Sequence, residues 1–395
     1  MMLPLAGVRM LDVTEHLAGP FCSMLLADMG VDVVKIERPG LGDTTRAQGP
    51  FAEKGISFAF TMVNRNKRSL TLNLKDRRGL EVARRLAAEI DIFLENFRPG
   101  VAGSLGLGYD VLRELNPRLI YCSISGFGQT GPYREQGGFD LIAQGMSGLM
   151  SVTGEPDGSP CKAGYPVTDL GTGMYAAYGI LAALHHRDRT GEGQLVDTSL
   201  FECGVSWSIW HVARYLGTGV TPQPQGSAHP LSAPYQAFPT ADGHIIVGGA
   251  SQAIWPRFCR VLGATDLCED PRFDTVAKRA VNAAELIALL EPSFRQRSSA
   301  EWSDLLTGAG VPCGPIKTIP QMLADPQARA RDMIIEYDHP AAGPLTNIGN
   351  PVKLSSTPVA LRVLPPTLGE HTEEILAQLG IPGPEIALLR SEGVV

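Results

Sequence analysis

Residues 8–37 read VRMLDVTEHLAGPFCSMLLADMGVDVVKIE, and two apolar runs flank a helical pattern in this stretch. The runs at 8–13 and 31–37 each predict a buried strand. Between them, residues 20–29 predict a helix, because Pro is favoured in a first helical turn and Gly30 is a typical stop signal. The stretch therefore predicts strand, helix and strand in succession.

The same alternation continues through the first third of the chain. Because apolar strands that alternate with helices form a mostly parallel sheet with both faces covered, we expect an α/β fold. The turn at residues 15–20 lacks G-x-G-x-x-G, so a nicotinamide or flavin site is not expected, although a nucleotide can still bind in the crevice there. Further strands are expected at 70–74, 91–94 and 119–124, with helices at 77–89 and 110–115.

Composition narrows the class of protein. A length of 395 residues favours two domains, and a net charge of −7 argues against a partner that is nucleic acid. Seven cysteines without a C-x-x-C pair are typical of reduced thiols, and no His or Cys cluster has the spacing of a metal site. No secretory signal or membrane span is recognisable, so we expect a cytoplasmic enzyme without a membrane partner.

Composition also indicates where the domains divide. Gly, Pro, Gln, Ser and Thr accumulate at 217–234, which predicts a linker. Residues 1–216 would then form the first part of a large domain, 235–319 a small α/β domain, and 320–395 a segment that returns to the large domain. Within the last two segments, strands are expected at 244–248 and 334–337, with helices near 253–262, 283–296, 300–307 and 373–379.

Asp169 is the most informative single residue. Gly164, Pro166 and Gly171 bracket it, and an Ala- and Leu-rich helical run follows at 174–184. A carboxylate beside a helix N-terminus usually serves as a cap. The alternative is a nucleophile that attacks an acyl group and carries it covalently. This segment alone favours capping and leaves the second reading open.

Four further clusters can bind ligands or be ordinary surface. Lys35 and Arg38 stand at the end of a predicted strand, and residues 64–69 with Lys75 are dense in basic side chains suited to phosphates. Residues 95–100 supply an amide, an aromatic ring and a guanidinium. Residues 248–252 follow a strand and precede a helix, so they can form a flexible lid whose N–H groups hold an anion. Solvated strand ends and tight turns are the alternatives.

Taken together, these motifs resemble family III CoA-transferases, the formyl-CoA and carnitine type of enzyme. The resemblance implies a large Rossmann-like domain built from both ends of the chain, a small inserted domain, and a homodimer of two interlocked rings. The motifs are Gly19-Pro20, Lys35-Ile36-Glu37, Gly42-Asp43, Glu95-Asn96-Phe97-Arg98-Pro99-Gly100, Ser125-Gly126-Phe127-Gly128, Gly131-Pro132-Tyr133, Asp169, Pro234-Tyr235-Gln236-Ala237-Phe238, Gly310-Val311-Pro312-Cys313-Gly314-Pro315 and Leu368-Gly369-Glu370-His371-Thr372.

The resemblance also assigns roles. It makes Asp169 the nucleophile and places a glycine-rich active-site loop at Gly248, Gly249 and Gln252. CoA and acyl-CoA would be substrates, with no permanently bound cofactor and no metal. Basic residues that some members use for phosphate are replaced here by Ser104 and Gly137. Positions expected to cradle CoA are Val13, Ala18, Arg38, Leu72, Lys75, Asn96 and Phe97.

The same fold also serves α-methylacyl-CoA racemases, which need a second proton-transferring group. Similar racemases have Gly-His-Asp where this chain has Gly138-Phe139-Asp140, and phenylalanine cannot carry a proton. We therefore expect acyl transfer, with racemisation and a non-catalytic CoA-binding scaffold as alternatives. Gln48, Ala59 and Phe139 replace aromatic residues that enclose oxalate in the formyl-CoA enzyme, which favours a larger dicarboxylate.

The expected reaction moves CoA from an acyl-CoA to a free carboxylic acid through an aspartyl anhydride and an aspartyl-CoA thioester. Residues 226–238 resemble the branch that uses succinyl-CoA and dicarboxylates. Arg46 and His229 are candidates for holding the far carboxylate of a diacid, and a surface salt bridge is the alternative for Arg46. Backbone N–H groups near Asp169 and at 248–252 are candidates for stabilising oxyanions.

Overall fold

A computed structural model describes residues 3–52 and 55–395. The chain divides into two compact units. The first comprises Met1–Leu149, Lys162–Thr218 and Pro326–Val395, and the second comprises Met150–Cys161 and Gly219–Asp325. The sequence did not indicate that Met150–Cys161 lies with the second unit.

The first unit is built on a six-stranded parallel sheet with the order β3-β2-β1-β4-β5-β6. The predicted α/β class and the parallel sheet are therefore confirmed. Strand order reverses between β1 and β4, and in such sheets the crevice at the carboxyl ends of these two strands is where ligands bind. The strands are β1 (Arg9–Asp12), β2 (Asp32–Glu37), β3 (Lys67–Thr71), β4 (Ile92–Glu95), β5 (Ile120–Ser125) and β6 (Leu195–Ser199).

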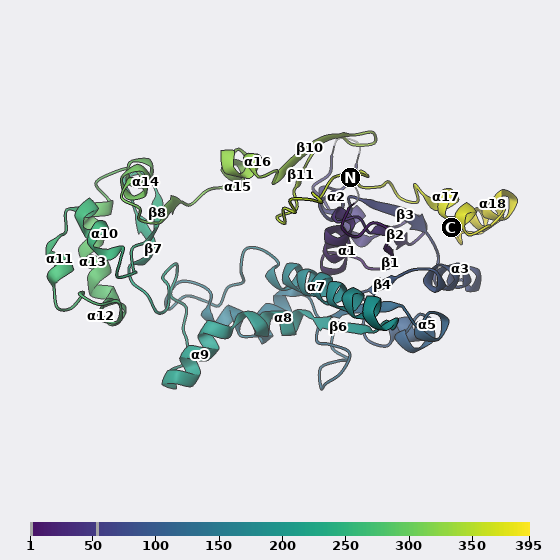
Figure 1. Cartoon of the computed structure of the whole chain (residues 1–395), viewed down its shortest axis with the longest axis horizontal. Helices are drawn as coiled ribbons and strands as arrows, with labels where there is room; N and C mark the ends of the chain where they lie inside the picture. Colours follow the sequence, from purple (N-terminus) through teal and green to yellow (C-terminus); the bar gives the residue numbers. More distant parts are fainter. Residues whose placement is uncertain (1–2, 53–54) are drawn as a thin grey trace. The chain divides into compact units, whose positions relative to one another are not determined.

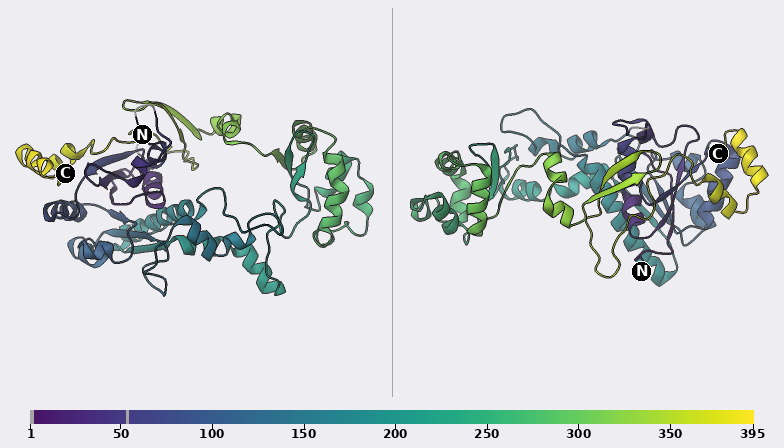
Figure 2. Two further views of the ribbon diagram at one scale, coloured as in Figure 1. Left: turned by 180° about the vertical axis from the view of Figure 1, so that it is seen from behind. Right: turned by 90° about the horizontal axis from the view of Figure 1, so that it is seen from above.

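Helices cover both faces of this sheet and form two cores. One core packs apolar side chains of α1 (Ala18–Asp28), α6 (Asp140–Met146), α7 (Val167–Thr190) and α8 (Leu200–Trp207) on the strands. The other uses α3 (Arg77–Ala88), α5 (Tyr109–Leu115), α17 (Thr372–Gln378) and α18 (Gly383–Ser391). The C-terminal helices α17 and α18, in yellow, lie against the N-terminal strands (Figures 1 and 2). Sequence ends that are far apart thus share one core.

Buried charges join the strands beneath the ligand edge of the sheet. Lys35 of β2 donates to Asp43 Oδ2 at 2.9 Å and to the Thr14 carbonyl at 2.6 Å, and both charged side chains are inaccessible to solvent. Lys67 of β3 is equally buried and contacts Asp12 Oδ2 at 3.3 Å. Neither of the two alternatives weighed from the sequence, a ligand-binding cation or a solvated strand end, describes Lys35 and Lys67, because both are neutralised inside the sheet.

Arg65 is likewise internal. Its guanidinium binds Asp28 through Nε and Nη2 at 2.9 and 2.7 Å, and Nη1 reaches the Ile348 carbonyl at 2.8 Å. The basic segment at residues 64–69 thus holds the fold together and does not form a phosphate site. The strand β3 runs from Lys67 to Thr71, so it begins and ends three residues earlier than the strand predicted at 70–74.

The second unit has its own antiparallel sheet, β7-β8-β9, and its own core around Phe238, Trp255, Phe258 and Phe294. Five helices surround that core, and a sixth precedes the return to the first unit. The elements are β7 (Tyr235–Pro239), β8 (His244–Gly248), β9 (Cys313–Pro315), α10 (Trp255–Leu262), α11 (Asp266–Glu269), α12 (Val276–Val281), α13 (Ala283–Phe294), α14 (Ser299–Gly308) and α15 (Ile319–Leu323).

Shorter elements complete the chain. None of the helices in the described part, residues 3–52 and 55–395, combines the length and apolar character needed to cross a membrane. The remaining elements are η1 (Thr44–Ala47), α2 (Phe58–Val63), α4 (Val101–Ser104), η2 (Leu149–Val152), α9 (Ile209–Thr218), α16 (Pro326–Ala330) and the hairpin β10 (Ile334–His339) with β11 (Gly343–Ile348).

Candidate active site

A cavity of about 450 Å³ opens at the carboxyl edge of the sheet in the first unit. Its walls come from the segments after β1, β4 and β5 and from the start of α7, so it lies at the crevice between β1 and β4. Residues that line it include His16, Ala18, Gln48, Ala59, Asn96, Phe97, Arg98, Ser125, Gly126, Gly137, Gly138, Phe139 and Asp169.

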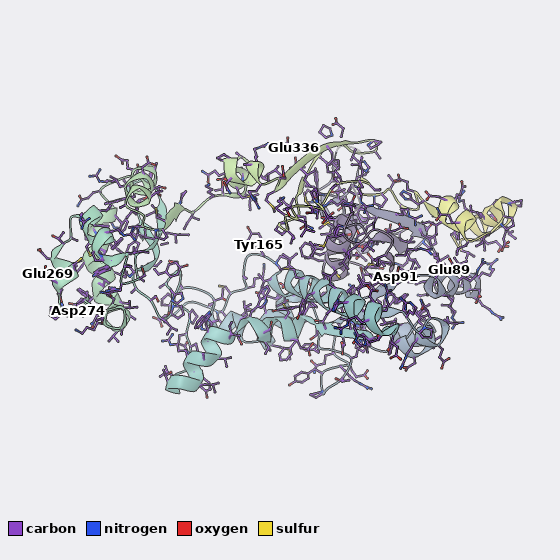
Figure 3. All side chains as sticks on the ribbon, viewed as in Figure 1. Glu89, Asp91, Tyr165, Glu269, Asp274 and Glu336 are labelled. Carbon is purple, nitrogen blue, oxygen red and sulfur yellow. The ribbon has the colours of Figure 1, made fainter. Side chains whose placement is uncertain are left out.

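Asp169 stands in the first turn of α7, which begins at Val167 and therefore earlier than the predicted helical run. The segment that leads into this helix carries Tyr165, labelled in Figure 3. The helix start is capped by Asp140, whose Oδ1 accepts from the Thr168 N–H at 2.9 Å and from the Thr168 hydroxyl at 2.8 Å. Capping is thus supplied by another carboxylate, which leaves Asp169 available for other chemistry.

No described residue donates a hydrogen bond to the Asp169 carboxylate. Burial raises the pKa of Asp169 to about 7, and the nearby negative charge of Asp140 adds to this effect. An ionised carboxylate that lacks solvation and hydrogen-bond donors is a better nucleophile than one in water. The surroundings of Asp169 therefore suit attack on an acyl carbon.

A second cavity of about 460 Å³ adjoins the first, and Phe97 lines both. Two exposed cations, Arg38 and Lys75, line the second cavity, and the Lys75 ammonium has no partner among the described residues. All seven residues predicted to cradle CoA line these two cavities. Val13, Arg38, Leu72 and Lys75 line the second, Ala18 and Asn96 line the first, and Phe97 lines both.

Asn96 joins the two turns that flank the crevice. Its Oδ1 accepts from the Glu15 N–H at 3.0 Å, and its Nδ2 donates to the Glu15 carbonyl at 2.7 Å. Because Glu15 follows β1 and Asn96 follows β4, this pair of hydrogen bonds fixes the distance between the two turns. Asn96 therefore positions both walls of the cavity, and its amide groups are already used within the chain.

Two glycines cross at the floor of the first cavity. A Cβ placed on Gly138 would lie 2.4 Å from the Gly126 Cα, so neither backbone has room for a side chain. At the neighbouring Gly137, a Cβ would lie 3.2 Å from Arg98 Nη2. The guanidinium of Arg98 therefore occupies the space above Gly137, the position where the resemblance implies a basic residue in some members.

The residues expected to enlarge the acyl pocket also meet at the first cavity. Gln48, Ala59 and Phe139 all line it, and Phe139 is 64% exposed. Neither an amide, a methyl group nor a phenyl ring transfers protons, so these three positions contribute shape and polarity.

Arg46 does not line either cavity. Its Nε and Nη2 bind the Glu37 carboxylate at 2.6 and 2.8 Å, and the guanidinium stacks 3.6 Å from the Phe60 ring centroid. The salt-bridge alternative weighed from the sequence describes this geometry. A role for Arg46 in holding a diacid stays a prediction.

The remaining predicted residues lie in the second unit. His229 stacks on Tyr235 with ring centroids 5.3 Å apart. The Gly248 and Gly249 N–H groups donate to the carbonyls of Pro312 and Pro234 at 2.8 and 2.9 Å, so these two groups are not free to hold an anion.

Gln252 anchors the end of this loop. Its amide donates to the Asp274 carbonyl at 2.7 Å and accepts from the buried Arg279 at 3.2 Å. A Cβ on Gly249 would lie 3.1 Å from both the Phe258 ring and Pro234, so a side chain there would press against both neighbours. In this structure the loop is a packed turn, and the expected flexible lid is not observed.

Two side chains at the first cavity were not singled out from the sequence. His16 was quoted only as part of a turn without a nucleotide motif, and Arg98 only as part of a strand-end cluster. Both are exposed and both line the cavity with Asp169. A signal for His16 was its place directly after a buried strand, at the edge where parallel sheets bind ligands.

Comparison with known proteins agrees with this geometry. Residues 5–372 match the model of CoA-transferase family III. The chain belongs to this family. A mouse succinyl-CoA:glutarate CoA-transferase is 40% identical, with 96% of this chain and 87% of the relative covered. A succinyl-CoA–D-citramalate CoA-transferase of Chloroflexus aurantiacus is 38% identical over 99% of this chain and 98% of the relative.

Among solved structures, a CAIB/BAIF family protein from Brucella suis superimposes with a TM-score of 0.85. It is 39% identical and covers 96% of this chain and 100% of its own. The predicted family and the predicted enzyme class, a CoA-transferase, are thus confirmed. In the described residues, no group of three His, Cys, Asp or Glu side chains is arranged to hold a metal ion.

Proposed function

We propose that this CoA-transferase moves CoA from succinyl-CoA to a free dicarboxylic acid, with Asp169 as the covalent carrier. The observation that carries the proposal is the half-buried Asp169 carboxylate, which has no hydrogen-bond donor in the described chain and lines a cavity next to the predicted CoA residues. The relatives named as succinyl-CoA:glutarate and succinyl-CoA–D-citramalate CoA-transferases support the substrate class.

Each step exchanges one activated carboxyl group for another. An Asp169 oxygen attacks the donor thioester carbon, the C–S bond breaks, and CoA leaves as a thiolate, which gives an aspartyl–acyl anhydride. The thiolate attacks the aspartyl carbonyl carbon, releases the donor acid and forms an aspartyl-CoA thioester. The acceptor carboxylate then attacks this thioester, and the same two exchanges in reverse order give the new acyl-CoA and free Asp169.

The chain supplies the groups that these steps need. The Asp169 N–H has no acceptor in the described part of the chain and lies at the positive end of α7, where it can donate to a tetrahedral oxyanion. Arg38 and Lys75 in the second cavity suit the phosphates of CoA. Arg98, which stands over Gly137, is positioned to replace the phosphate contact expected from a basic residue there.

A trapping experiment tests the carrier directly. Protein incubated with succinyl-CoA and then hydroxylamine should acquire a hydroxamate confined to the peptide that contains Asp169, as seen by intact mass and peptide mapping. The Asp169→Asn variant should acquire none. Exchange of an α-proton of a branched acyl-CoA with deuterated water, without any adduct, would instead identify the racemase alternative.

We also propose a homodimer, as the family resemblance implies. Helix α9 has no buried residue in the single chain, although it carries large apolar side chains. Ile209, Trp210 and Leu216 are 65%, 65% and 76% exposed. Contiguous apolar surface of this kind marks an interface, and a second copy of the chain is the occupant that the family implies. Light scattering at micromolar concentration should give twice the chain mass.

A further inference from the structure

His16 is held in an unusual backbone conformation between β1 and α1. Its φ angle is +69°, a left-handed value that residues other than glycine rarely adopt. The conformation is maintained because the His16 N–H donates to Asp43 Oδ1 at 3.3 Å, and Asp43 is itself fixed by the buried Lys35 at 2.9 Å. Such strained residues cluster where a side chain must be aimed at a ligand.

The His16 imidazole is exposed, and two neighbouring side chains hold it in place. It packs edge-on against Phe139 with ring centroids 6.4 Å apart, and Thr44 Oγ1 lies 3.3 Å from Nδ1 and 3.2 Å from Nε2. Since one hydroxyl pairs with one ring nitrogen at a time, the other nitrogen is available to a ligand. The side chain therefore offers one free polar atom from a defined position.

Two chains of contacts connect this imidazole to Asp169. Phe139 precedes Asp140, whose carboxylate binds Thr168, the neighbour of Asp169. One turn after Asp169, a Cβ on Gly173 would lie 2.7 Å from the Ala18 carbonyl, so α7 and the start of α1 are in direct contact. His16 is two residues before Ala18, so it is fixed relative to the nucleophile.

Arg98 and His16 both line the first cavity, but they contact different neighbours. Arg98 follows Phe97, which both cavities share, and its guanidinium stands over Gly137. Glu15, which precedes His16, lines the second cavity, but the His16 ring itself contacts Phe139, one of the residues expected to shape the acyl pocket. Thr45, next to the Thr44 that His16 contacts, lines the same first cavity.

We propose that His16 binds the free carboxylate of the dicarboxylic acid whose other carboxyl group reacts with Asp169. This inference rests on the proposed function and names the residue that would make the enzyme select diacids. An imidazole N–H donates well to a carboxylate oxygen, and an acid that ends in a methyl group leaves that donor unpaired. Selection against such monoacids follows.

The test compares glutarate with pentanoate, in which a methyl group replaces the far carboxylate. Both acceptors attack the same aspartyl-CoA thioester, so the ratio of their kcat/KM values does not depend on the donor. His16→Gly removes the imidazole and suits the left-handed backbone, and His16→Asn tolerates this backbone while keeping an amide donor. Both variants therefore avoid a loss of folding as the explanation.

In His16→Gly, the glutarate-to-pentanoate ratio should fall about tenfold or more, which is the value of a hydrogen bond to a charged group. His16→Asn should recover part of that selectivity. The exposed His185 of α7 provides a matched control, and His185→Ala should leave the ratio unchanged. The Kd for CoA, measured by calorimetry, should stay within about twofold of wild type in all three variants.

Two outcomes would overturn the assignment of His16 alone. One is an unchanged ratio in His16→Gly while wild type forms the Asp169 adduct. The other is a loss of diacid selectivity in Arg98→Gln but not in His16→Gly. If wild type transfers no CoA to any acid and forms no adduct, the proposed function fails, and the inference about His16 fails with it.

Discussion

Asp169 has a chemical environment that a capping carboxylate does not need. Burial raises its pKa to about 7, and Asp140 performs the capping. In the Asp169→Asn variant we expect CoA transfer to fall by at least about a thousandfold, because an amide cannot form the covalent intermediates. Affinity for CoA should be nearly unchanged. Steady-state kinetics with calorimetry checks both, and retained turnover would remove Asp169 from the mechanism.

The same variant should also change the pH dependence of stability. Between pH 3.8 and about 7, native Asp169 binds a proton that the unfolded chain has released, so this residue makes the wild type less stable as pH rises. Asp169→Asn has no such loss. At pH 8 its free energy of unfolding should exceed that of wild type by about 1–4 kcal/mol, and the difference should vanish toward pH 4. Urea titrations at the two pH values measure it.

Ionisation of Asp169 should control the rate of acylation. Because the proposed nucleophile is the ionised form of Asp169, the single-turnover rate with succinyl-CoA should rise with pH and level off above about 7. Asp140→Asn removes the nearby negative charge and should move this midpoint to lower pH, while its remaining carbonyl oxygen still caps α7. A midpoint that stays in place would show that Asp140 has no electrostatic effect on Asp169.

At the residue scale, the sequence predicted which positions lie together better than it predicted their surroundings. The family motifs named Asp169 and seven CoA residues, and the structure places all eight on two adjoining cavities, while their roles stay predictions. The burial of Lys35 and Lys67 was not predicted, because a lysine near a strand end looks exposed until folding brings its partners, Asp43 and Asp12, close. His16 was overlooked because its backbone angle and its contact with Phe139 are properties of the folded chain.

At the scale of elements, the crossing of Gly126 and Gly138 fixes the segment that carries Phe139. Gly138→Ala would place a Cβ 2.4 Å from a backbone atom, so it should cost about 3 kcal/mol of stability or abolish folding. The adjacent Gly137→Ala is a matched control, since its Cβ meets only the movable end of Arg98. It should cost no more than about 0.5 kcal/mol. Thermal unfolding measures the stability of the two variants, and an equal loss of stability in both would contradict the close packing of Gly126 and Gly138.

Element positions were predictable where the apolar pattern is strong. The strands β1, β2, β4 and β5 and the helices α1, α3 and α5 occur within a few residues of their expected places. The start of β3 and the whole of β6 were not predicted. The start of β3 is polar, and its Lys67 is buried only because Asp12 of β1 pairs with it. The strand β6, Leu195–Ser199, is an edge strand whose side chains are mostly not buried. Neither shows the continuous apolar run of a central strand.

At the scale of the whole molecule, the last residues complete a core begun by the first ones. Leu376 of α17 is fully buried in the core that contains Leu11 and Val34, whereas Leu388 of α18 is 54% exposed. Leu376→Ala should lower the free energy of unfolding by about 2–5 kcal/mol, and Leu388→Ala by less than about 0.5 kcal/mol. Denaturant titration compares them. Similar losses would mean that the C-terminal helices are not part of the folding unit.

The sequence indicated a linker and an inserted segment by composition, since Gly and Pro interrupt apolar periodicity near residues 217–234. It gave no sign that Met150–Cys161 packs with the second unit. The Gly and Pro residues of that segment indicate a loop but not the unit it packs with. Its placement depends on contacts such as the hydrogen bond from the Gly226 N–H to the Gly154 carbonyl at 2.8 Å. Contacts between distant segments are not encoded in any local pattern.

The absence of hydrogen-bond donors around the Asp169 side chain has a consequence for the order of events in a catalytic cycle. In the proposed cycle, an Asp169 oxygen first bonds to the acyl carbon, and the Asp169 carboxyl carbon then bonds to the CoA sulfur. In both states the side chain is neutral, and the half-buried site no longer holds a charge. In this cycle the ionised Asp169 of the resting enzyme has the higher electrostatic free energy, and the neutral thioester has the lower one. The proposed thioester can therefore persist while the donor acid dissociates and the acceptor acid binds.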